Sequence, residues 1–276
     1  MTAEGQLILS ELRRLGLIAR PLVWDDPAVD WTLPAVTVIR ETCDYHHRRD
    51  EFVAWADRVS SQTTLLNSAE IVRWNTHKSY LRDLERKGVP IVPTEWLEAG
   101  TEADLLHIMS TNGWSTVVVK PAVSASAYET MLVATDKTAE GQSHIERLLP
   151  TRDLMVQPFL TSVRDYGERS LLFIDGELTH AVRRKPALGP TEEGNPWEAT
   201  PVDPTPEEAE FATEALRASH FSTLYARVDI VRDPSNAIRL MELELIEPSL
   251  FLQFAHHATS RLAEGIMQLC RSQKGY

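Results

Sequence analysis

The sequence predicts an α/β protein with α+β parts. Strand patterns alternate with helix patterns in the first half of the chain, and paired strand patterns with tight turns dominate the second half. With 276 residues, the chain can form two or three compact units with a substantial core. Hydrophobic residues make up 43% and charged residues 25%, which is typical of a globular protein.

The N-terminal elements alternate between helix and strand. Apolar residues at helical spacing predict a first helix over residues 4–15. The following segments are predicted as strands at 18–24, 35–39 and 64–67 and as helices at 49–59 and 78–88, the last ended by Gly88. Such alternation favours an α/β layer with a parallel sheet.

The middle and C-terminal segments are richer in strands. Two prolines keep residues 89–97 extended, and residues 115–134 predict a hairpin with the small-residue turn SASA. Further strands are predicted at 154–160 and within 169–186, where Asp-Gly-Glu marks a tight turn. The remaining predictions are a long loop at 186–208, a helix at 206–219, a hairpin at 225–248 and a terminal helix at 255–272.

Charge and composition exclude several classes of function. Lys plus Arg is 28 and Asp plus Glu is 40, so the net charge of −12 argues against broad binding of nucleic acid or anionic membranes. No apolar run approaches the roughly 20 residues that span a bilayer, and the N-terminus has the pattern of an amphipathic helix, not of a signal peptide. Two cysteines are too few for a disulfide framework, so we expect a reduced, cytoplasmic setting.

The C-terminal hairpin carries unusual charges on its strands. Since side chains alternate along a strand, Arg227 and Asp229 share one face, and Glu242 and Glu244 share one face. A turn centred between residues 235 and 236 pairs Asp229 with Glu242 and Arg227 with Glu244, unless a bulge shifts the register. Facing carboxylates repel each other without a cation between them, and oxygen ligands suit Mg²⁺. The alternative is a solvent-exposed hairpin whose polar face carries these charges without a binding function.

Two lysines and several short segments link this hairpin to a known family. Lys78 lies in NTHKSYL, and Lys120 ends the apolar run VVVK. With VWDDPAVDW, RETCDYHHRRDEF, VKPAVSASA, GERSLLFIDGELTHAV and ELELIEPSLFL, these segments follow one another in the order of the ATP-grasp superfamily, which the chain resembles from about residue 5 to 255. The resemblance is closest to bacterial ATP-grasp ligases that include the O-ureido-D-serine cyclo-ligase of cycloserine biosynthesis.

The resemblance implies an ATP-grasp fold with assigned roles. It implies an N-terminal pre-ATP-grasp-like unit over 1–75 that lacks the family's usual first strand, a central lid subdomain over 76–160, and a C-terminal subdomain with the metal site over 161–276. The implied ligands of one or two Mg²⁺ ions, or of Mn²⁺ in their place, are Asp229, Glu242 and Glu244. The implied catalytic residues are Arg227 and Lys120. The implied nucleotide contacts are Lys78, Lys120, Ser124, Ser126, Gln157, Phe159, Leu160 and Glu168.

Members of the family often have an arginine in a GDFR segment of the loop after the HAV strand. This chain lacks that arginine. Arg183, Arg184 or Lys185 is expected to supply the cation instead, with Arg183 as the assigned residue. For the substrate, the loop after strand 35–39 offers Arg40, Thr42, Asp44 and Tyr45, because α/β ligand loops tend to follow such strands. Arg40 is expected to pair with a substrate carboxylate and Asp44 with its amine.

The function implied is an ATP-dependent carboxylate–amine ligase. It would activate a small amino-acid-like carboxylate as an acyl phosphate for amide formation or cyclisation. ATP and a small amino-acid-like molecule are its expected partners, and no nucleic acid or membrane is expected. Because relatives with this fold are often dimers, a homodimer is also among the expected assemblies. The competing hypothesis is a non-catalytic nucleotide-binding protein, which the missing first strand and missing loop arginine favour.

Overall fold

The computed structural model describes residues 1–185 and 198–273. The helices are α1 (Ala3–Arg14), α2 (Arg49–Ser60), α3 (Ala69–Asn75), α4 (Tyr80–Arg86), α5 (Leu105–Asn112), α6 (Thr138–Leu148), α7 (Thr161–Asp165), α8 (Pro206–Ala218) and α9 (His256–Gln273). The strands are β1 (Val36–Val38), β2 (Thr64–Leu66), β3 (Glu95–Leu97), β4 (Thr116–Pro121), β5 (Met131–Ala134), β6 (Leu154–Pro158), β7 (Glu168–Ile174), β8 (Glu177–Arg184), β9 (Ala199–Val202), β10 (Tyr225–Arg232) and β11 (Ile238–Glu244). Among the helices so described, none has the length and apolar composition required to cross a bilayer.

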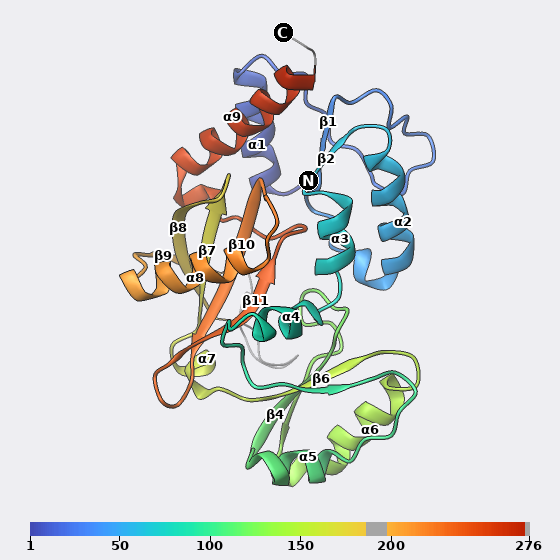
Figure 1. Ribbon diagram of the computed structural model, residues 1–276, viewed down its shortest axis with the longest axis vertical. Coiled ribbons are helices and arrows are strands. Elements are labelled where there is room, and N and C mark those ends of the chain that lie inside the picture. Colours follow the sequence, from blue (N-terminus) through green and yellow to red (C-terminus); the bar gives the residue numbers. More distant parts are fainter. Residues whose placement is uncertain (186–197, 274–276) are drawn as a thin grey trace.

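A five-stranded antiparallel sheet in the order β11-β10-β7-β8-β9 forms the largest layer. Its central strand β7 is buried on both faces, so its apolar residues alternate between two cores. Leu171 and Phe173 belong to the core that includes α8, whereas Leu172 and Ile174 belong to the core with α1 and α9. Figure 1 shows α8 crossing this sheet and α9 running beside α1. The sheet is therefore covered by helices on both faces.

A four-stranded antiparallel sheet in the order β3-β6-β4-β5 forms a second layer. Helices α5 and α6 pack on it through a core that includes Leu105, Ile145 and Val133. In Figure 1 this unit lies at the opposite end of the molecule from α9. Strands β4 and β6 thus belong to one of the two larger sheets, and strands β10 and β11 belong to the other.

The N-terminal part has a small parallel pair of strands, β1 and β2. Its core is aromatic: Phe52 and Trp55 stack with ring centroids 5.2 Å apart, and Trp24 meets Phe52 edge-on at 5.2 Å. Such ring pairs add to the free energy gained by burial. The predicted parallel pairing is confirmed here, although it extends over two strands and most pairing elsewhere in the described chain is antiparallel.

The C-terminal hairpin has the predicted register where it carries charge. Arg227 faces Glu244 and Asp229 faces Glu242. A bulge follows on the turn side, because Ile230 pairs with Leu240 and leaves Met241 without a partner on β10. The bulge is placed beyond the charged pairs, so it leaves them opposite each other.

Two predicted elements are corrected. Residues 18–24 form no strand, and only Trp24 of this segment is buried. The predicted loop at 186–208 contains β9, and residues 186–197 of that loop lie outside the described chain. The sequence did not predict α3, α5, α6 or α7. The hairpins at 115–134, 169–186 and 225–248 are confirmed.

Candidate active site

Three carboxylates converge on one face of the β10–β11 hairpin. Strand alternation places Asp229 on β10 and Glu242 and Glu244 on β11 on the same side, and one oxygen from each lies within 4.8 Å of the others. Asp229 is buried, whereas the two glutamates are half-buried. An all-oxygen donor set of this size fits a hard cation such as Mg²⁺.

Two arginines neutralise the inner part of this cluster. Arg227 donates to both oxygens of Asp229, with Nη2 at 2.9 Å from Oδ2, and also pairs with Glu244. Arg184 on β8 donates to Asp229 Oδ2 at 2.9 Å and to Glu168 Oε2 at 3.0 Å. Ser170 Oγ adds a hydrogen bond of 2.6 Å to Asp229. Asp229 is thereby held in one orientation.

Two lysines converge on Glu242 from outside the hairpin. Lys78 precedes α4, Lys120 lies on β4, and each places its Nζ atom 3.3 Å from Glu242 Oε1. The backbone N–H of Lys78 donates to the carbonyl of Ala122 at 2.8 Å, which links the two lysine segments. The structure therefore brings both predicted lysines next to the predicted carboxylates.

The ionisation of the carboxylates differs with their partners. Burial opposes ionisation of Glu242, but Lys78 and Lys120 outweigh it and hold its pKa well below the ordinary value. Burial likewise opposes ionisation of Asp229, and Arg184 and Arg227 bring its pKa below the ordinary value. For Glu244, burial dominates and raises the pKa despite Arg227. Glu242 and Asp229 are thus the firmly ionised members of the set.

The chain after β6 provides an apolar wall. Leu160 belongs to a small buried cluster with Val92, Val163 and Val231, against which Phe159 and Met241 pack. The side chain of Gln157 is buried and donates to Thr94 Oγ1 at 2.9 Å. The assigned hinge residues therefore lie together, with Gln157 engaged inside the protein.

The loop between β4 and β5 folds back toward the lysines. Ser124 is buried, and its carbonyl lies 3.4 Å from Lys78 Nζ. Ser126 has a left-handed φ of 51°, a conformation that few non-glycine residues adopt. At the tip, the ring of Tyr128 lies 4.8 Å from that of His47 and 5.1 Å from that of His46. The loop thus bridges the four-stranded sheet and the N-terminal part.

The predicted substrate residues have mixed positions. Arg40 pairs with Glu4 at 2.6 Å and donates to the carbonyl of Pro248 at 2.7 Å. Asp44 pairs with Arg48 at 2.7 Å, so it already has a cation. Tyr45 is buried in the aromatic core. Arg40 and Asp44 are therefore both engaged by protein partners.

Arg183, which the sequence analysis assigns as the replacement cation, lies in a different environment from the neighbouring Arg184. Arg183 lies over the ring of Tyr166, 5.2 Å from its centroid, whereas Arg184 contacts the carboxylates. Alternation along β8 places consecutive arginines on opposite faces. The sequence analysis also did not single out Ser170 or Glu247, although Glu247 follows Glu242 and Glu244 in the run ELELIEP.

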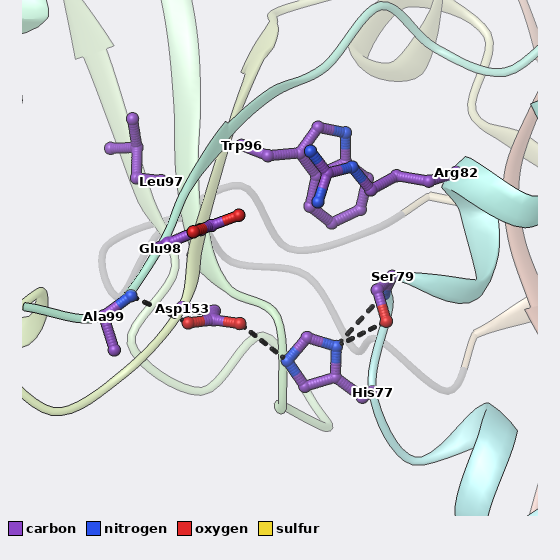
Figure 2. Close-up of a pocket in the computed structure, with 8 residues that line it drawn as sticks. All are labelled: His77, Ser79, Arg82, Trp96, Leu97, Glu98, Ala99 and Asp153. Carbon is purple, nitrogen blue, oxygen red and sulfur yellow. Dashed lines mark hydrogen bonds and ion pairs between the residues drawn. The ribbon is translucent and has the colours of Figure 1, made fainter. Parts of the chain in front are cut away.

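A separate cavity of about 300 Å³ opens between α4 and β3. Figure 2 shows Arg82 over the ring of Trp96 and His77 between Ser79 and Asp153. Its lining is His77, Ser79, Arg82, Trp96, Leu97, Glu98, Ala99 and Asp153. The three carboxylates and the two lysines of the site do not line it, so it is distinct from the charged cluster.

Comparisons with known proteins identify relatives of the whole chain. The family described as the N-terminal domain of D-cycloserine synthetase DcsG matches residues 1–67. The chain is 30% identical over 278 residues to the cycloserine biosynthesis protein DcsG of Streptomyces lavendulae, covering 95% of this chain and 92% of that protein. The crystal structure of D-cycloserine synthetase DcsG is similar with a TM-score of 0.88 and 28% identity, covering 97% of this chain and 94% of that chain.

More distant structures share the fold. D-alanine–D-alanine ligase from Bacillus anthracis is similar with a TM-score of 0.68 and 13% identity, covering 100% of this chain and 96% of that chain. The ATP-grasp ligase PsnB, complexed with the precursor peptide PsnA2 and AMPPNP, has a TM-score of 0.65 and 16% identity, covering 98% and 95%. At these identities the likeness establishes the ATP-grasp fold alone.

Proposed function

The chain belongs to the family of the ATP-grasp ligase DcsG, and from this premise we propose that it is a Mg²⁺-dependent enzyme that activates a small amino-acid-like carboxylate as an acyl phosphate. Family membership makes it an ATP-dependent carboxylate–amine ligase. The metal dependence, the acyl phosphate and the class of substrate are the proposed parts. The product would be an amide, formed with a second molecule or by cyclisation.

One observation supports the proposal more than any other. Lys78, Lys120 and Arg227 come from separate elements, yet their charged groups all contact the carboxylate set on β10 and β11. Burying so many charged groups in one place costs desolvation free energy even when they are paired, and such clusters are typical of sites that bind charged ligands. The phosphates of a bound nucleotide would pair with the lysines and Arg227, and the accompanying metal cation would pair with the carboxylates.

The carboxylates suit the cation. Asp229, Glu242 and Glu244 would hold one or two Mg²⁺ ions, or Mn²⁺ in their place, since their oxygens lie within 4.8 Å of one another. The bound ion would neutralise charge on the phosphates. The low pKa values of Glu242 and Asp229 keep those two ligands ionised.

The cationic side chains would act on the phosphates. Lys78 and Lys120 would turn from Glu242 toward the nucleotide as point charges. Arg227, fixed by Asp229 and Glu244, would face the transferring group as a preorganised cation. Arg184 replaces Arg183 in our proposal as the cation of the β8 end, because it contacts Asp229 and Glu168.

The remaining nucleotide contacts would surround these groups. Phe159 and Leu160 would border the adenine, and Gln157 would position this segment from behind through Thr94. Glu168 would lie near the ribose or the phosphates. Ser124 and Ser126 would present the loop between β4 and β5 to the phosphates, where the loop excludes water from an acyl phosphate.

The proposed reaction has two steps. A substrate carboxylate oxygen attacks the γ-phosphorus of ATP, and ADP leaves. The nucleophilic nitrogen then attacks the acyl carbon, inorganic phosphate leaves, and the nitrogen loses a proton. Arg40, which is fixed by Glu4, and Thr42 would line the substrate pocket, and Tyr45 would support this loop from the aromatic core.

ADP release with Mg·ATP tests the proposal. The panel contains D-serine, D-alanine and O-ureido-D-serine, and we expect ADP with at least one of them. Lys120→Ala and Glu242→Gln should each lower this rate by at least about 100-fold, because each removes a charge that acts in a water-poor site.

The control is Glu210→Gln on α8, which is outside the charged cluster and should leave the rate unchanged. Tight binding of Mg·ATP without ADP release from any compound would contradict the ligase and favour a nucleotide-binding protein. Full activity of Glu242→Gln would contradict the metal assignment.

A further inference from the structure

Glu247 has an unusual position at the end of β11. It lies three residues beyond Glu244, at the start of the loop that leaves the strand, and its side chain is half-buried. Within residues 1–185 and 198–273, its carboxylate forms no ion pair and no hydrogen bond to another residue. By contrast, Asp44 on the facing loop is already paired with Arg48.

The loop with Glu247 lies against the predicted substrate loop. The hydroxyl of Tyr225 lies within hydrogen-bond distance of the carbonyl oxygens of Ile39 at 2.5 Å and Ile246 at 2.8 Å. Arg40 donates to the carbonyl of Pro248 at 2.7 Å. These contacts on both sides of Glu247 hold it at the junction between the charged cluster and residues 39–45.

The predicted substrate loop also carries two buried polar atoms with free hydrogen-bonding capacity. Arg40 Nη1 and Thr42 Oγ1 are buried and have no hydrogen-bond partner in the described part of the chain. Buried polar groups without partners are rare in native proteins and call for a ligand or ordered water. The junction therefore offers donors from one loop and an acceptor from the other.

The charges around Glu247 leave it without a dedicated cation. Burial and then the negative charge of Glu244 raise the pKa of Glu247 to about 8. The neighbouring guanidinium groups, Arg40 and Arg227, oppose this rise, but each is paired with other carboxylates. Tyr225, Tyr45 and Cys43 are the other titratable groups that face it. A cationic ligand group would supply the missing partner.

We propose that Glu247 binds the ammonium group of the amino-acid substrate and so selects α-amino acids over plain carboxylic acids. The inference rests on the proposed function and names the substrate class of the same site. In an α-amino acid the ammonium and the carboxylate share one carbon. Substrate bound at Glu247 would therefore direct its carboxylate toward Arg227, which lies close enough to influence the ionisation of Glu247.

Calorimetric binding tests this assignment without requiring turnover. Each probe is titrated into the full chain with Mg²⁺ and a non-hydrolysable ATP analogue present. The probe pairs are O-ureido-D-serine with 3-ureidooxypropanoate, D-serine with 3-hydroxypropanoate, and D-alanine with propanoate. Within each pair the two compounds differ by the ammonium group.

We expect the ammonium-bearing member of at least one pair to bind about 10- to 100-fold more tightly, as hydrogen bonds between charged groups do. Glu247→Gln should abolish that preference, and Glu247→Asp should keep part of it. Glu41→Gln is the matched control, since Glu41 lies on the facing loop with its carboxylate bonded to Thr2, and it should keep the full preference. No preference in any pair, or a preference that survives in Glu247→Gln, overturns the assignment.

The ADP assay keeps the two proposals apart. An ammonium preference that depends on Glu247 without ADP release supports this site and contradicts the ligase. ADP release with equal use of both members of each pair supports the ligase and overturns the role of Glu247.

Discussion

At the scale of single residues, Arg184 illustrates how one side chain sets the charge of the site. Its guanidinium contacts Asp229, Glu168 and Ser170 at 2.8 to 3.0 Å. Two of these partners are carboxylates, and burial raises the pKa of Glu168 although Arg184 opposes it. Arg184 thus offsets the electrostatic repulsion between the carboxylates of Asp229 and Glu168.

Replacing this arginine should damage both stability and turnover. In Arg184→Met, Asp229 and Glu168 lose their shared cation, and we expect about 3–5 kcal/mol less free energy of unfolding, typical of breaking a buried ion pair. Urea unfolding and ADP release measure the two effects. Arg183→Met is the comparison, because Arg183 lies over Tyr166. A larger loss in Arg183→Met would restore Arg183 as the functional cation.

Glu247 should give the ligand-free protein a recognisable pH dependence. Its pKa is raised from the ordinary 4.5 to about 8, so between these pH values the folded state holds a proton that the unfolded state has released. The free energy of unfolding therefore falls as the pH rises from about 4.5 to 8. Glu247→Gln removes this contribution.

Urea unfolding of both proteins at pH 5, 6.5 and 8 checks the sign. The stability of the wild type relative to Glu247→Gln should decrease over this range, because titrating groups that do not interact with Glu247 cancel in the comparison. Parallel curves would show that Glu247 titrates normally.

At the scale of elements, the loop between β4 and β5 contacts the N-terminal part of the chain through its tip. Tyr128 contacts His46 and His47 of the N-terminal part, and Arg152 lies over its ring, 5.5 Å from the centroid. Because this loop is proposed to cover the phosphates, these contacts should favour its closed position. They connect nucleotide binding with the substrate loop that ends in the two histidines.

Removing the tip ring should weaken nucleotide use. Tyr128→Ala should raise the KM for ATP by about 2- to 10-fold, the range that aromatic contacts contribute. Steady-state kinetics with the panel substrate measures this change. Tyr128→Phe retains the ring and should behave as the wild type. An unchanged KM in Tyr128→Ala would show that the loop closes without this contact.

Local patterns predicted the hairpins because their alternation and turn residues lie within a few positions of each other. Other elements depend on distant contacts. Residues 18–24 have a strand composition but no strand partner, and Ile18 remains 89% exposed. Helix α6 contains Gly141, usually a helix breaker, yet a Cβ atom there would lie 2.7 Å from side-chain atoms of Leu105 and Val133. Close packing explains this glycine, and a local pattern could not show it.

The same distinction holds in the site. The carboxylates and Arg227 were predictable because the hairpin register follows from one turn. The choice between Arg183 and Arg184 depends on how β8 pairs with β7 across a bulge at Leu172 and Phe173. The pairing of Arg40 with Glu4 joins positions 36 residues apart, and no local pattern indicates it.

At the scale of the whole molecule, the charged site joins the two larger sheets, because Lys120 on β4 contacts Glu242 on β11. Filling the site should therefore stabilise the entire fold. We expect Mg·ADP at 100 times its Kd to add about 2.7 kcal/mol to the free energy of unfolding. A thermal shift assay should show a higher Tm, which EDTA reverses in part.

Glu242→Gln is the informative variant in this assay. It should keep a response to ADP alone and lose the additional response to Mg²⁺, because the ion loses one carboxylate ligand. An equal shift with and without Mg²⁺ in the wild type would contradict a metal site at these carboxylates.

The packing of α1 against α9 has a consequence for the synthesis of the protein. Glu11 on α1 accepts a hydrogen bond from Ser260 on α9 across 249 positions of the chain, and Ile8 and Leu12 are buried in the core that contains Leu262. At about 5–20 residues per second, the ribosome needs roughly 12 to 50 seconds to make the intervening chain. During that time the apolar side of the first helix lacks its partner α9, so the nascent chain offers a binding site for chaperones until its last helix emerges.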